Sequence, residues 1–201
     1  YMARDGWGIK PLYYYQNDKT LMFASEIKAF LDHPDFKKEF NDEILSAYLC
    51  FNSVPTEETF FKGVKRVEPG HQLIYKDNKL EIERFFKLEF DEQNTDIEKS
   101  AEEINEAMKD SVKRHFHADV EVGSLLSSGV DSSYIVSIGK PNKTFTVGYD
   151  DPRYNEINYA EDLTEKLGIQ NISKKMTQEE YIKNFPKLMY HMDEPLADPS
   201  T

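Results

Sequence analysis

A run of small polar residues near the middle of the chain has the composition of an anion-binding loop. An apolar stretch, residues 120–126, leads into Ser127-Ser128-Gly129-Val130-Asp131-Ser132-Ser133, and residues 134–138 are apolar again. This order is typical of a short strand, a tight loop and the first turns of a helix. Such a junction directs several backbone N–H groups and the positive end of the helix toward one point. An anion is favoured there, most often a phosphate.

Side chains in this loop add to the chemistry that the backbone offers. Gly129 has no Cβ that would hold a phosphate away from the backbone. Four serine hydroxyls are further donors, those of Ser127, Ser128, Ser132 and Ser133. Asp131 is a hard carboxylate, the kind of ligand that suits Mg²⁺ beside phosphate oxygens. The alternative is a strand-to-helix junction whose serines and aspartate only cap a helix.

The elements after the loop predict a parallel sheet that places the loop at a ligand-binding edge. The sequence alternates between strands expected at 144–149 and 171–176 and helices expected at 155–167 and 178–192. Strands and helices in this order form right-handed βαβ units and a doubly wound α/β sheet. Ligands bind such sheets outside the carboxyl ends of the strands. The loop and the end of the strand that contains Val147 are therefore expected at the same edge.

The first half of the chain is richer in hairpins than in helices. A hairpin is expected from 12–15 and 21–24, and a second from 72–76 and 80–86 with Asp77-Asn78 at its turn. Further expected elements are a helical turn at 25–31, a helix at 44–51 with Asn41 as N-cap, and a helix at 97–117. The apolar stripe of that last helix is predicted to comprise Ile104, Ala107, Met108, Ser111 and Val112. The polar residues 91–96 read as a linker.

Composition excludes several classes of protein. The 201 residues are 39% hydrophobic, enough for a buried core, and no apolar run approaches the ~20 residues of a transmembrane helix. A formal net charge of −12 argues against a nucleic-acid partner, because a phosphate backbone would be repelled. The single cysteine, Cys50, excludes a disulfide framework and suits the cytoplasm. Because Cys50 lies in an apolar-rich helical stretch, we expect a buried structural thiol and not a nucleophile.

The central loop resembles a known signature for binding pyrophosphate. The common G-x-x-x-x-G-K-[ST] loop is excluded because Val130 follows Gly129 where that loop has lysine. The residues are similar instead to S-G-G-x-D-S, the signature of the ATP pyrophosphatase or PP-loop family, with Ser128 in place of the first glycine. Members of that family adenylate a carbonyl or carboxylate and release pyrophosphate that this loop holds.

A second resemblance appears at the start of the chain. Arg4-Asp5-x-x-Gly8-Ile9-Lys10-Pro11-Leu12-Tyr13, followed by Phe23-Ala24-Ser25-Glu26-Ile27-Lys28-Ala29, looks like the closing segment of class II glutamine amidotransferase domains. Those domains use an N-terminal cysteine as nucleophile, and this segment has none. We therefore expect residues 1–40 to be the C-terminal remnant of an N-terminal-nucleophile glutaminase domain, without glutaminase activity of its own.

The order of segments along the chain resembles a glutamine-hydrolysing asparagine synthetase. A glutaminase tail, an aromatic hairpin, a PP-loop, a Thr146-Val147-Gly148 strand and an Asp193-Glu194-Pro195 segment follow one another. The resemblance implies three parts: the remnant at 1–40, a connecting helix and hairpin at 41–95, and the first part of a PP-loop synthetase domain at 96–201. It further implies a chain truncated at both ends, with catalytic residues downstream of Thr201 and upstream of Tyr1.

By this resemblance the parent enzyme is an amide-forming ligase that uses ATP and Mg²⁺. It adenylates the side-chain carboxylate of aspartate, and ammonia from glutamine displaces AMP to form asparagine. Residues 127–133 would hold the phosphates, Asp131 would bind Mg²⁺, and Leu125 with Val147 would flank the adenosine; the alternative for these two is plain sheet core. The implied partners are small molecules, with no nucleic acid and no membrane, and a homodimer stays open.

Two other functions remain open at this point. A related PP-loop ligase, such as a β-lactam synthetase, shares the fused architecture but adenylates another carboxylate. A fragment that binds nucleotide without catalysis, and is inactive alone, is an answer of a different class. Pocket residues beyond Thr201 would separate the two ligases, and an ATP titration would test the inert fragment.

Overall fold

The computed structural model describes residues 1–92 and 96–195, and their contacts divide the chain into two compact units. The first unit comprises residues 1–90 together with the chain from residue 184 onward, and the second comprises residues 91–183. The first contains antiparallel strands and short helices. The second contains a parallel sheet with helical connections and the candidate loop.

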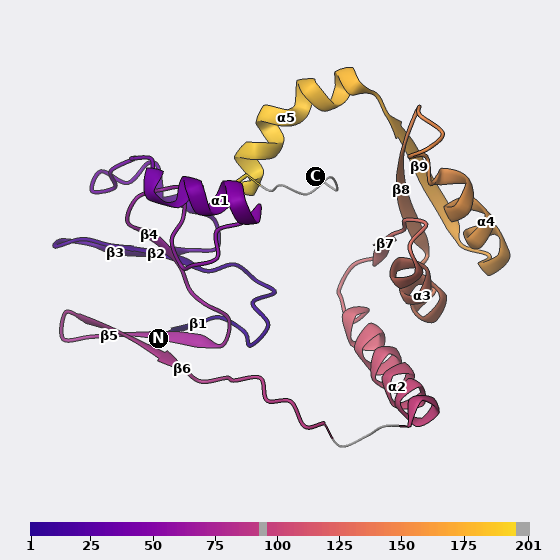
Figure 1. The fold of residues 1–201 in the computed structure, drawn as a ribbon, viewed down its shortest axis with the longest axis horizontal. Helices are drawn as coiled ribbons and strands as arrows, with labels where there is room; N and C mark the ends of the chain where they lie inside the picture. Colours follow the sequence, from indigo (N-terminus) through magenta and orange to yellow (C-terminus); the bar gives the residue numbers. More distant parts are fainter. Residues whose placement is uncertain (93–95, 196–201) are drawn as a thin grey trace. The chain divides into compact units, whose positions relative to one another are not determined.

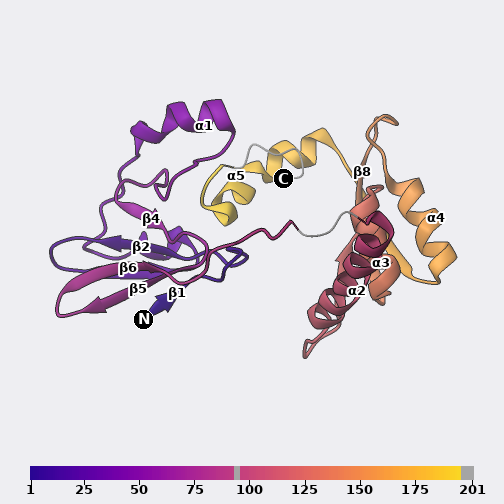
Figure 2. The same cartoon turned by 60° about the horizontal axis from the view of Figure 1, so that its bottom comes forward.

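Two three-stranded antiparallel sheets form the first unit (Figures 1 and 2). One sheet has the order β3-β2-β4, and the other has the order β1-β5-β6. Their bounds are β1 Met2–Ala3, β2 Tyr13–Gln16, β3 Leu21–Ala24, β4 Val64–Arg66, β5 His71–Lys76 and β6 Lys79–Arg84. Both expected hairpins are confirmed: β2 pairs with β3, and β5 pairs with β6. Asp77 and Asn78 have φ values of 51° and 60°, as a two-residue hairpin turn requires.

Strand β2 is buried on both faces because its side chains alternate between two apolar clusters. Tyr14 packs with Val67 and Leu73 between the two sheets. Tyr13 points to the opposite face and packs with Ile27 and other residues outside the second sheet. The β3-β2-β4 sheet is therefore the middle layer of this unit.

Three short helices of this unit differ in detail from the expectations. The turn expected at 25–31 is a 3₁₀ helix, η1 Ile27–Phe30. Another 3₁₀ helix, η2 Asp42–Ile44, precedes α1 Leu45–Phe51. Asn41 lies at the N-cap of η2, but its side chain does not cap: its Nδ2 donates to the Thr59 carbonyl at 3.1 Å.

The expectation of a buried thiol at Cys50 is wrong. Cys50 is a free, exposed cysteine in α1. The physical reason is that α1 buries none of its residues, although several of them are apolar. An apolar composition predicted a buried helix, whereas this helix lies on the surface of its unit.

The second unit has a parallel sheet of order β7-β8-β9 (Figure 1). Its strands are β7 Gly123–Leu125, β8 Lys143–Tyr149 and β9 Gln170–Met176, connected by helices α3 Val130–Gly139 and α4 Ile157–Leu167. The expected strand–helix alternation is confirmed, and α4 ends at Gly168 with φ 69° as predicted. α5 Gln178–Met192 follows, with Pro186 inside it.

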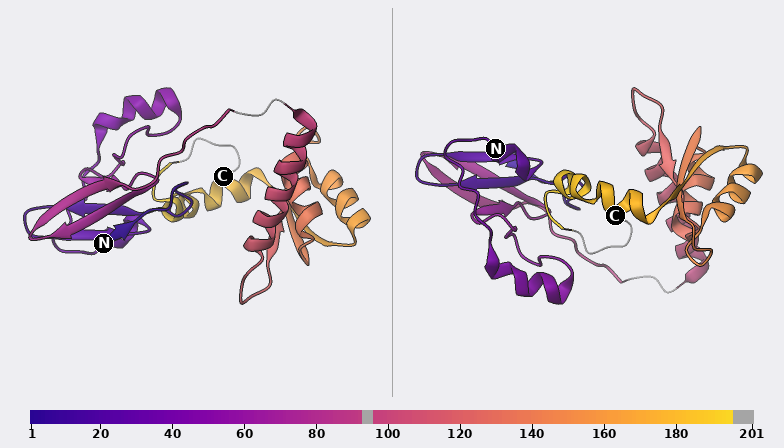
Figure 3. Two further views of the ribbon diagram at one scale, coloured as in Figure 1. Left: turned by 90° about the horizontal axis from the view of Figure 1, so that it is seen from below. Right: turned by 90° about the horizontal axis from the view of Figure 1, so that it is seen from above.

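α2 Ile97–His115 precedes the sheet and packs against α3 (Figure 3). Asp96 caps α2, because its Oδ1 accepts hydrogen bonds from the amides of Glu98 and Lys99. The predicted apolar stripe is only partly buried: Val112 is buried, whereas Ile104 is 62% exposed. The expected linker at 91–96 includes residues 93–95, which lie outside the described residues.

The parallel sheet has one covered face in the described chain. Leu126, Val136 and Ala160 form a buried cluster that joins the end of β7 to α3 and α4. In β8 the burial alternates, so that Thr144, Thr146 and Gly148 are buried and the residues between them are exposed. A sheet with parallel strands and helical crossovers is thus observed, and a doubly wound arrangement stays a proposal. No helix among the described residues is long and apolar enough to cross a membrane.

The units do not follow the three parts expected from the sequence. β1 pairs with β5, and β2 pairs with β4, so segments 1–40 and 41–90 share both sheets of the first unit. The boundaries at 40/41 and 95/96 remain predictions about the order of functional segments.

The close packing around Gly148 predicts that one added methyl group there would destabilise the second unit. A Cβ at this position would lie 2.7 Å from Cγ1 and Cδ1 of Ile157, which is itself buried. Gly148→Ala should therefore lower the free energy of unfolding by about 1–3 kcal/mol. The measurement is urea denaturation followed by far-UV circular dichroism. Tyr149→Phe, at an exposed neighbouring position, is the control and should change stability by less than about 0.5 kcal/mol.

Candidate phosphate-binding site

The end of strand β7 holds the start of the candidate loop in place. The amide of Leu126 donates to the Phe145 carbonyl at 2.9 Å, and the Thr146 hydroxyl donates to the Leu126 carbonyl at 2.9 Å. The Leu126 side chain is 3% exposed. The chain therefore leaves the sheet from a buried, hydrogen-bonded position and becomes exposed directly afterwards at Ser127.

Hydrogen bonds among its own serines close the loop. The hydroxyls of Ser127 and Ser132 lie 2.9 Å apart, and the Gly129 amide donates to the Ser127 hydroxyl at 3.1 Å. The Ser132 hydroxyl also contacts the Ser127 amide at 3.3 Å and the Gly129 carbonyl at 3.1 Å. These bonds involve the loop alone, so they fix its shape in the absence of a ligand.

The first turn of α3 keeps its backbone donors free of a side-chain cap. Gly129 occupies the N-cap position and has no side chain that could accept from the turn. Ser133 is the first residue whose amide bonds within the helix, to the Gly129 carbonyl at 3.1 Å. By helix geometry, the amides of Val130, Asp131 and Ser132 have no intrahelical partner. Three adjacent donors at the positive end of a ten-residue helix suit an anion.

Asp131 does not act as a cap in this arrangement. It is the one acidic residue in the first turn of α3, and its side chain is exposed. Within the described part of the chain, no hydrogen bond or ion pair involves its carboxylate. The geometry therefore does not support a helix-capping role for Asp131, whereas Ser127 and Ser132 do form hydrogen bonds with Gly129, the N-cap residue of α3.

Glu156 contributes a carboxylate that the sequence analysis did not single out. It lies at the N-cap of α4, and its Oε2 accepts the Ser128 amide at 3.1 Å. A carboxylate thus occupies a loop donor that a bound anion could use. The signal was available in the predicted topology, because Glu156 follows β8 at the same edge of the sheet as the loop.

Because of this contact, removing the negative charge of Glu156 is expected to increase the affinity of the loop for anions. Glu156→Gln can still accept from Ser128 but no longer repels a phosphate, so pyrophosphate should bind up to about fivefold more tightly, as for a contact worth ~1 kcal/mol. Isothermal titration of the chain with pyrophosphate measures the change. Glu165→Gln, an equal charge change at an exposed position within α4, is the control and should leave the affinity unaltered.

Leu125 and Val147 share one face of the sheet. Leu125 pairs in register with Phe145, and Val147 lies two residues further along β8, so their side chains point the same way. Leu125 is 81% exposed and Val147 is 49% exposed. The alternative that both are plain sheet core is therefore wrong for the described chain. An exposed apolar pair beside the loop is compatible with stacking against a base.

The donor set fits a magnesium ion that is shared with a phosphate. Among the residues that the structure describes, no three His, Cys, Asp or Glu side chains cluster as a metal site. Mg²⁺ commonly takes only one or two carboxylates and completes its shell with water and substrate phosphates. Asp131, one exposed carboxylate beside three free amides, matches that pattern.

Comparisons with known proteins agree with the order of segments along the chain. The family model described as asparagine synthase matches residues 103–201, and the model described as glutamine amidotransferase domain matches residues 1–86. The chain is a relative of the glutamine-hydrolysing asparagine synthetases. The expected resemblance is confirmed. The second model extends well beyond the forty residues that the sequence analysis assigned to a glutaminase remnant.

Individual relatives resemble this chain along nearly all of its length. Glutamine-hydrolysing asparagine synthetase 1 of Bacillus subtilis (strain 168) is 42% identical over 205 residues, which cover 100% of this chain and 32% of that protein. A putative glutamine-hydrolysing asparagine synthetase of Mycobacterium bovis is 32% identical over 212 residues, with the same coverage. A Penicillium rubens protein named amidase chyE is 31% identical over 226 residues, covering 98% of this chain and 32% of the relative. The chain spans about a third of the length of these relatives.

Proposed function

We propose that this chain carries the phosphate-binding part of an ATP-dependent, glutamine-hydrolysing asparagine synthetase. The proposal depends on three amides at the start of α3 that lack intrahelical partners, next to the Asp131 carboxylate, which has no partner among the described residues. The match of residues 103–201 to the asparagine synthase family supports it independently.

Each loop residue has a role in this proposal. The amides of Val130, Asp131 and Ser132, with the hydroxyls of Ser127, Ser128 and Ser133, would hold the phosphates of ATP; Gly129 leaves the approach open. Asp131 would bind Mg²⁺, because a carboxylate next to an anion site is repulsive unless a cation lies between the two charges. The metal would neutralise charge on the phosphates, and the loop amides would orient them.

The adenosine would lie on the exposed side of the sheet. Leu125 and Val147 offer an apolar surface on that face, at the edge where the loop begins. Adenine would cover these side chains while its phosphates reach the loop. A PP-loop type of doubly wound sheet, with Mg-ATP as cofactor and a cytoplasmic location, forms part of the same proposal.

For the whole enzyme we propose adenylation of aspartate, release of pyrophosphate and transfer of an amide nitrogen from glutamine. The test is an assay of aspartate-dependent AMP and pyrophosphate formation by the complete translation product of the gene. AMP formed with aspartate and ammonia, together with asparagine, is the expected result. Absence of AMP with aspartate, but its formation with another carboxylic acid, would replace asparagine synthesis by another ligase activity.

The names of two relatives are the reason to consider a second activity. Relatives named amidase chyE and amidase chry2 match this chain over 98% of its length, as do several asparagine synthetases. Proteins with different names thus share these segments. A ligase that forms an amide on another carboxylate, as in the β-lactam synthetase alternative, is the second candidate.

A further inference from the structure

Within the first unit, two adjacent carboxylates directly after α5 make buried contacts with segments from the start of the chain. Asp193 and Glu194 belong to the acidic segment that the sequence resemblance singled out without giving it a role. Asp193 has φ 62°, in the left-handed region that aspartate tolerates better than most residues. The Asp193 side chain is 6% exposed and the Glu194 side chain 12%. For comparison, the helix pair Arg114–Asp110 is 77% and 60% exposed.

Asp193 caps a helix that lies 166 residues earlier in the chain. Its Oδ2 accepts the Ile27 amide at 2.7 Å, and its Oδ1 accepts the Lys28 amide at 3.1 Å. These are the first residues of η1, whose own N-cap residue, Glu26, provides no side-chain bond. The Lys28 Nζ lies 3.0 Å from Asp193 Oδ1 and also donates to the His191 carbonyl at 3.3 Å. Asp193 therefore supplies the cap that η1 lacks locally. It is also a second counter-charge for Lys28, whose Nζ lies 3.0 Å from Oε2 of the neighbouring Glu26 as well.

Glu194 makes an equivalent pair of contacts with a different part of the first unit, the amide of Phe60 and the guanidinium of Arg66. Its Oε1 accepts the Phe60 amide at 3.3 Å, and its Oε2 lies 2.7 Å from Nη2 of Arg66 in β4. Burial alone would lower the pKa of the Arg66 guanidinium, but the hydrogen bond and negative charge of Glu194, together with Tyr13, raise that pKa overall. Each carboxylate thus contacts the same two kinds of partner, a backbone amide and a cation.

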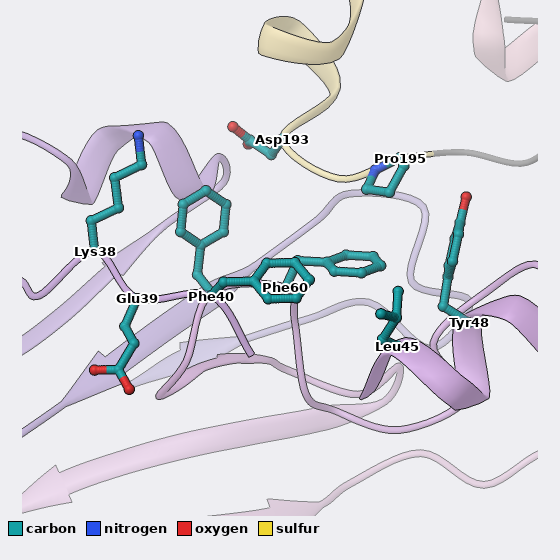
Figure 4. A pocket seen from close by; sticks show the side chains of 9 residues that line it. Lys38, Glu39, Phe40, Leu45, Tyr48, Phe60, Asp193 and Pro195 are labelled. Atoms are coloured by element: carbon teal, nitrogen blue, oxygen red, sulfur yellow. The ribbon is translucent and has the colours of Figure 1, made fainter. Parts of the chain in front are cut away.

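The contacts join segments that match two different families. Ile27, Lys28, Phe60 and Arg66 lie within residues 1–86, which match the glutamine amidotransferase domain. Asp193 and Glu194 lie within residues 103–201, which match asparagine synthase. Asp193 and Pro195 also form one wall of a cavity of about 460 Å³, whose other wall includes the rings of Phe40 and Phe60 (Figure 4).

We propose that Asp193 and Glu194 form an acidic latch, a single docking element that attaches the asparagine-synthase segment to the amidotransferase segment. The docking surface offers three backbone amides and the cations of Lys28 and Arg66 as donors. The partner that it fits is a pair of adjacent carboxylates at the end of a helix. The proposal does not depend on the proposed enzymatic function. Because the two carboxylates are neighbours in sequence, release of one removes the positional constraint on the other. The latch is therefore expected to open as a unit.

Hydrogen–deuterium exchange of the 201-residue chain tests the latch. Asp193→Gly removes the carboxylate and suits the positive φ, so any loss is due to the side chain and not to backbone strain. We expect the Ile27 and Lys28 amides to exchange about ten- to a hundredfold faster, since both lose a charged acceptor. Glu194→Gln keeps an acceptor for Phe60 but removes the charge next to Arg66, and should accelerate exchange at Phe60. Glu39→Gln, in an exposed ion pair with Lys62, is the control and should alter none of these amides.

The double variant distinguishes one latch from two separate contacts. If the latch opens as a unit, Asp193→Gly alone also accelerates exchange at Phe60, and adding Glu194→Gln accelerates it little further. Effects confined to each carboxylate's own amide, or unchanged exchange in both single variants, would overturn the proposal. Protection in β2 and β3 shows whether a variant has unfolded the unit. If a variant has unfolded the unit, Arg66→Gln replaces it as the test, because this substitution removes the cation that pairs with Glu194. Faster amide exchange at residues 190–195 then supports the latch, and unchanged exchange there overturns it.

Discussion

Asp131→Asn is expected to reduce the strengthening effect of Mg²⁺ on ATP binding to this chain. In the unaltered protein, Mg²⁺ should strengthen ATP binding, because Asp131 would hold the cation and the cation would neutralise charge on the phosphates. In the variant, ATP without metal should bind as well or better, since a repulsive charge has gone. With Mg²⁺ it should bind about ten- to a hundredfold more weakly than in the unaltered protein, the loss of one charge-assisted contact. Calorimetric titrations with and without Mg²⁺ measure all four affinities.

Stability separates this role of Asp131 from a structural one. Asp131 has no partner in the described chain, so its replacement should leave the thermal melt within the small range of surface substitutions. Asp162→Asn is the matched control: it removes a carboxylate from α4, which pairs on the surface with Lys166, and should change neither stability nor metal dependence. Unaltered Mg²⁺ dependence in a folded Asp131→Asn chain would rule out the metal assignment.

Leu126→Ala is expected to destabilise the second unit by about 2–5 kcal/mol, the range for a buried leucine whose removal leaves a cavity. Leu126 is 3% exposed and packs with Val136 and Ala160 directly before the loop. Hydrogen exchange in β8 should accelerate accordingly. Trp7, the one tryptophan of the chain, lies in the first unit, so its fluorescence reports whether that unit keeps its structure.

The neighbouring leucine is the matched control and a second test of the site. Leu125 is 81% exposed, so Leu125→Ala should change stability by less than about 0.5 kcal/mol. Because Leu125 is proposed to contact adenosine, the same variant should weaken ATP binding while leaving pyrophosphate binding intact. Equal destabilisation by both substitutions would contradict the observed alternation of burial at the end of β7.

The candidate loop could be located from sequence because its signals are local. Small residues between an apolar strand and an apolar helix start determine the geometry over about a dozen residues, and parallel βαβ topology places the loop at a sheet edge. The hairpins could be predicted from sequence equally well, since Asp77 and Asn78 suit the positive φ values that the turn requires. Periodicity and turn chemistry act within a few residues and do not depend on the rest of the fold.

Features that depend on distant residues could not be predicted in this way. The cysteine of α1 was expected inside, yet burial depends on whether another element covers that helix. The side chain of Asn41 bonds to Thr59, and the cap of η1 comes from Asp193, far along the sequence. Glu156 is a mixed case: the predicted topology already placed it at the edge of the sheet where the loop lies, but its hydrogen bond with Ser128 joins two loops that only the folded sheet brings together.

Nuclear magnetic resonance of backbone amides, followed during titration with Mg-ATP, tests the phosphate-binding role of residues 127–133 most directly. If these residues hold the phosphates, the amides of Val130, Asp131 and Ser132 shift most and saturate together, even at millimolar affinity. Pyrophosphate should move the same three amides, and the resonances of Leu125 and Val147 should respond to ATP alone. Saturable ATP binding that leaves Val130, Asp131 and Ser132 unshifted would contradict the proposed site, and so would an absence of binding at millimolar Mg-ATP.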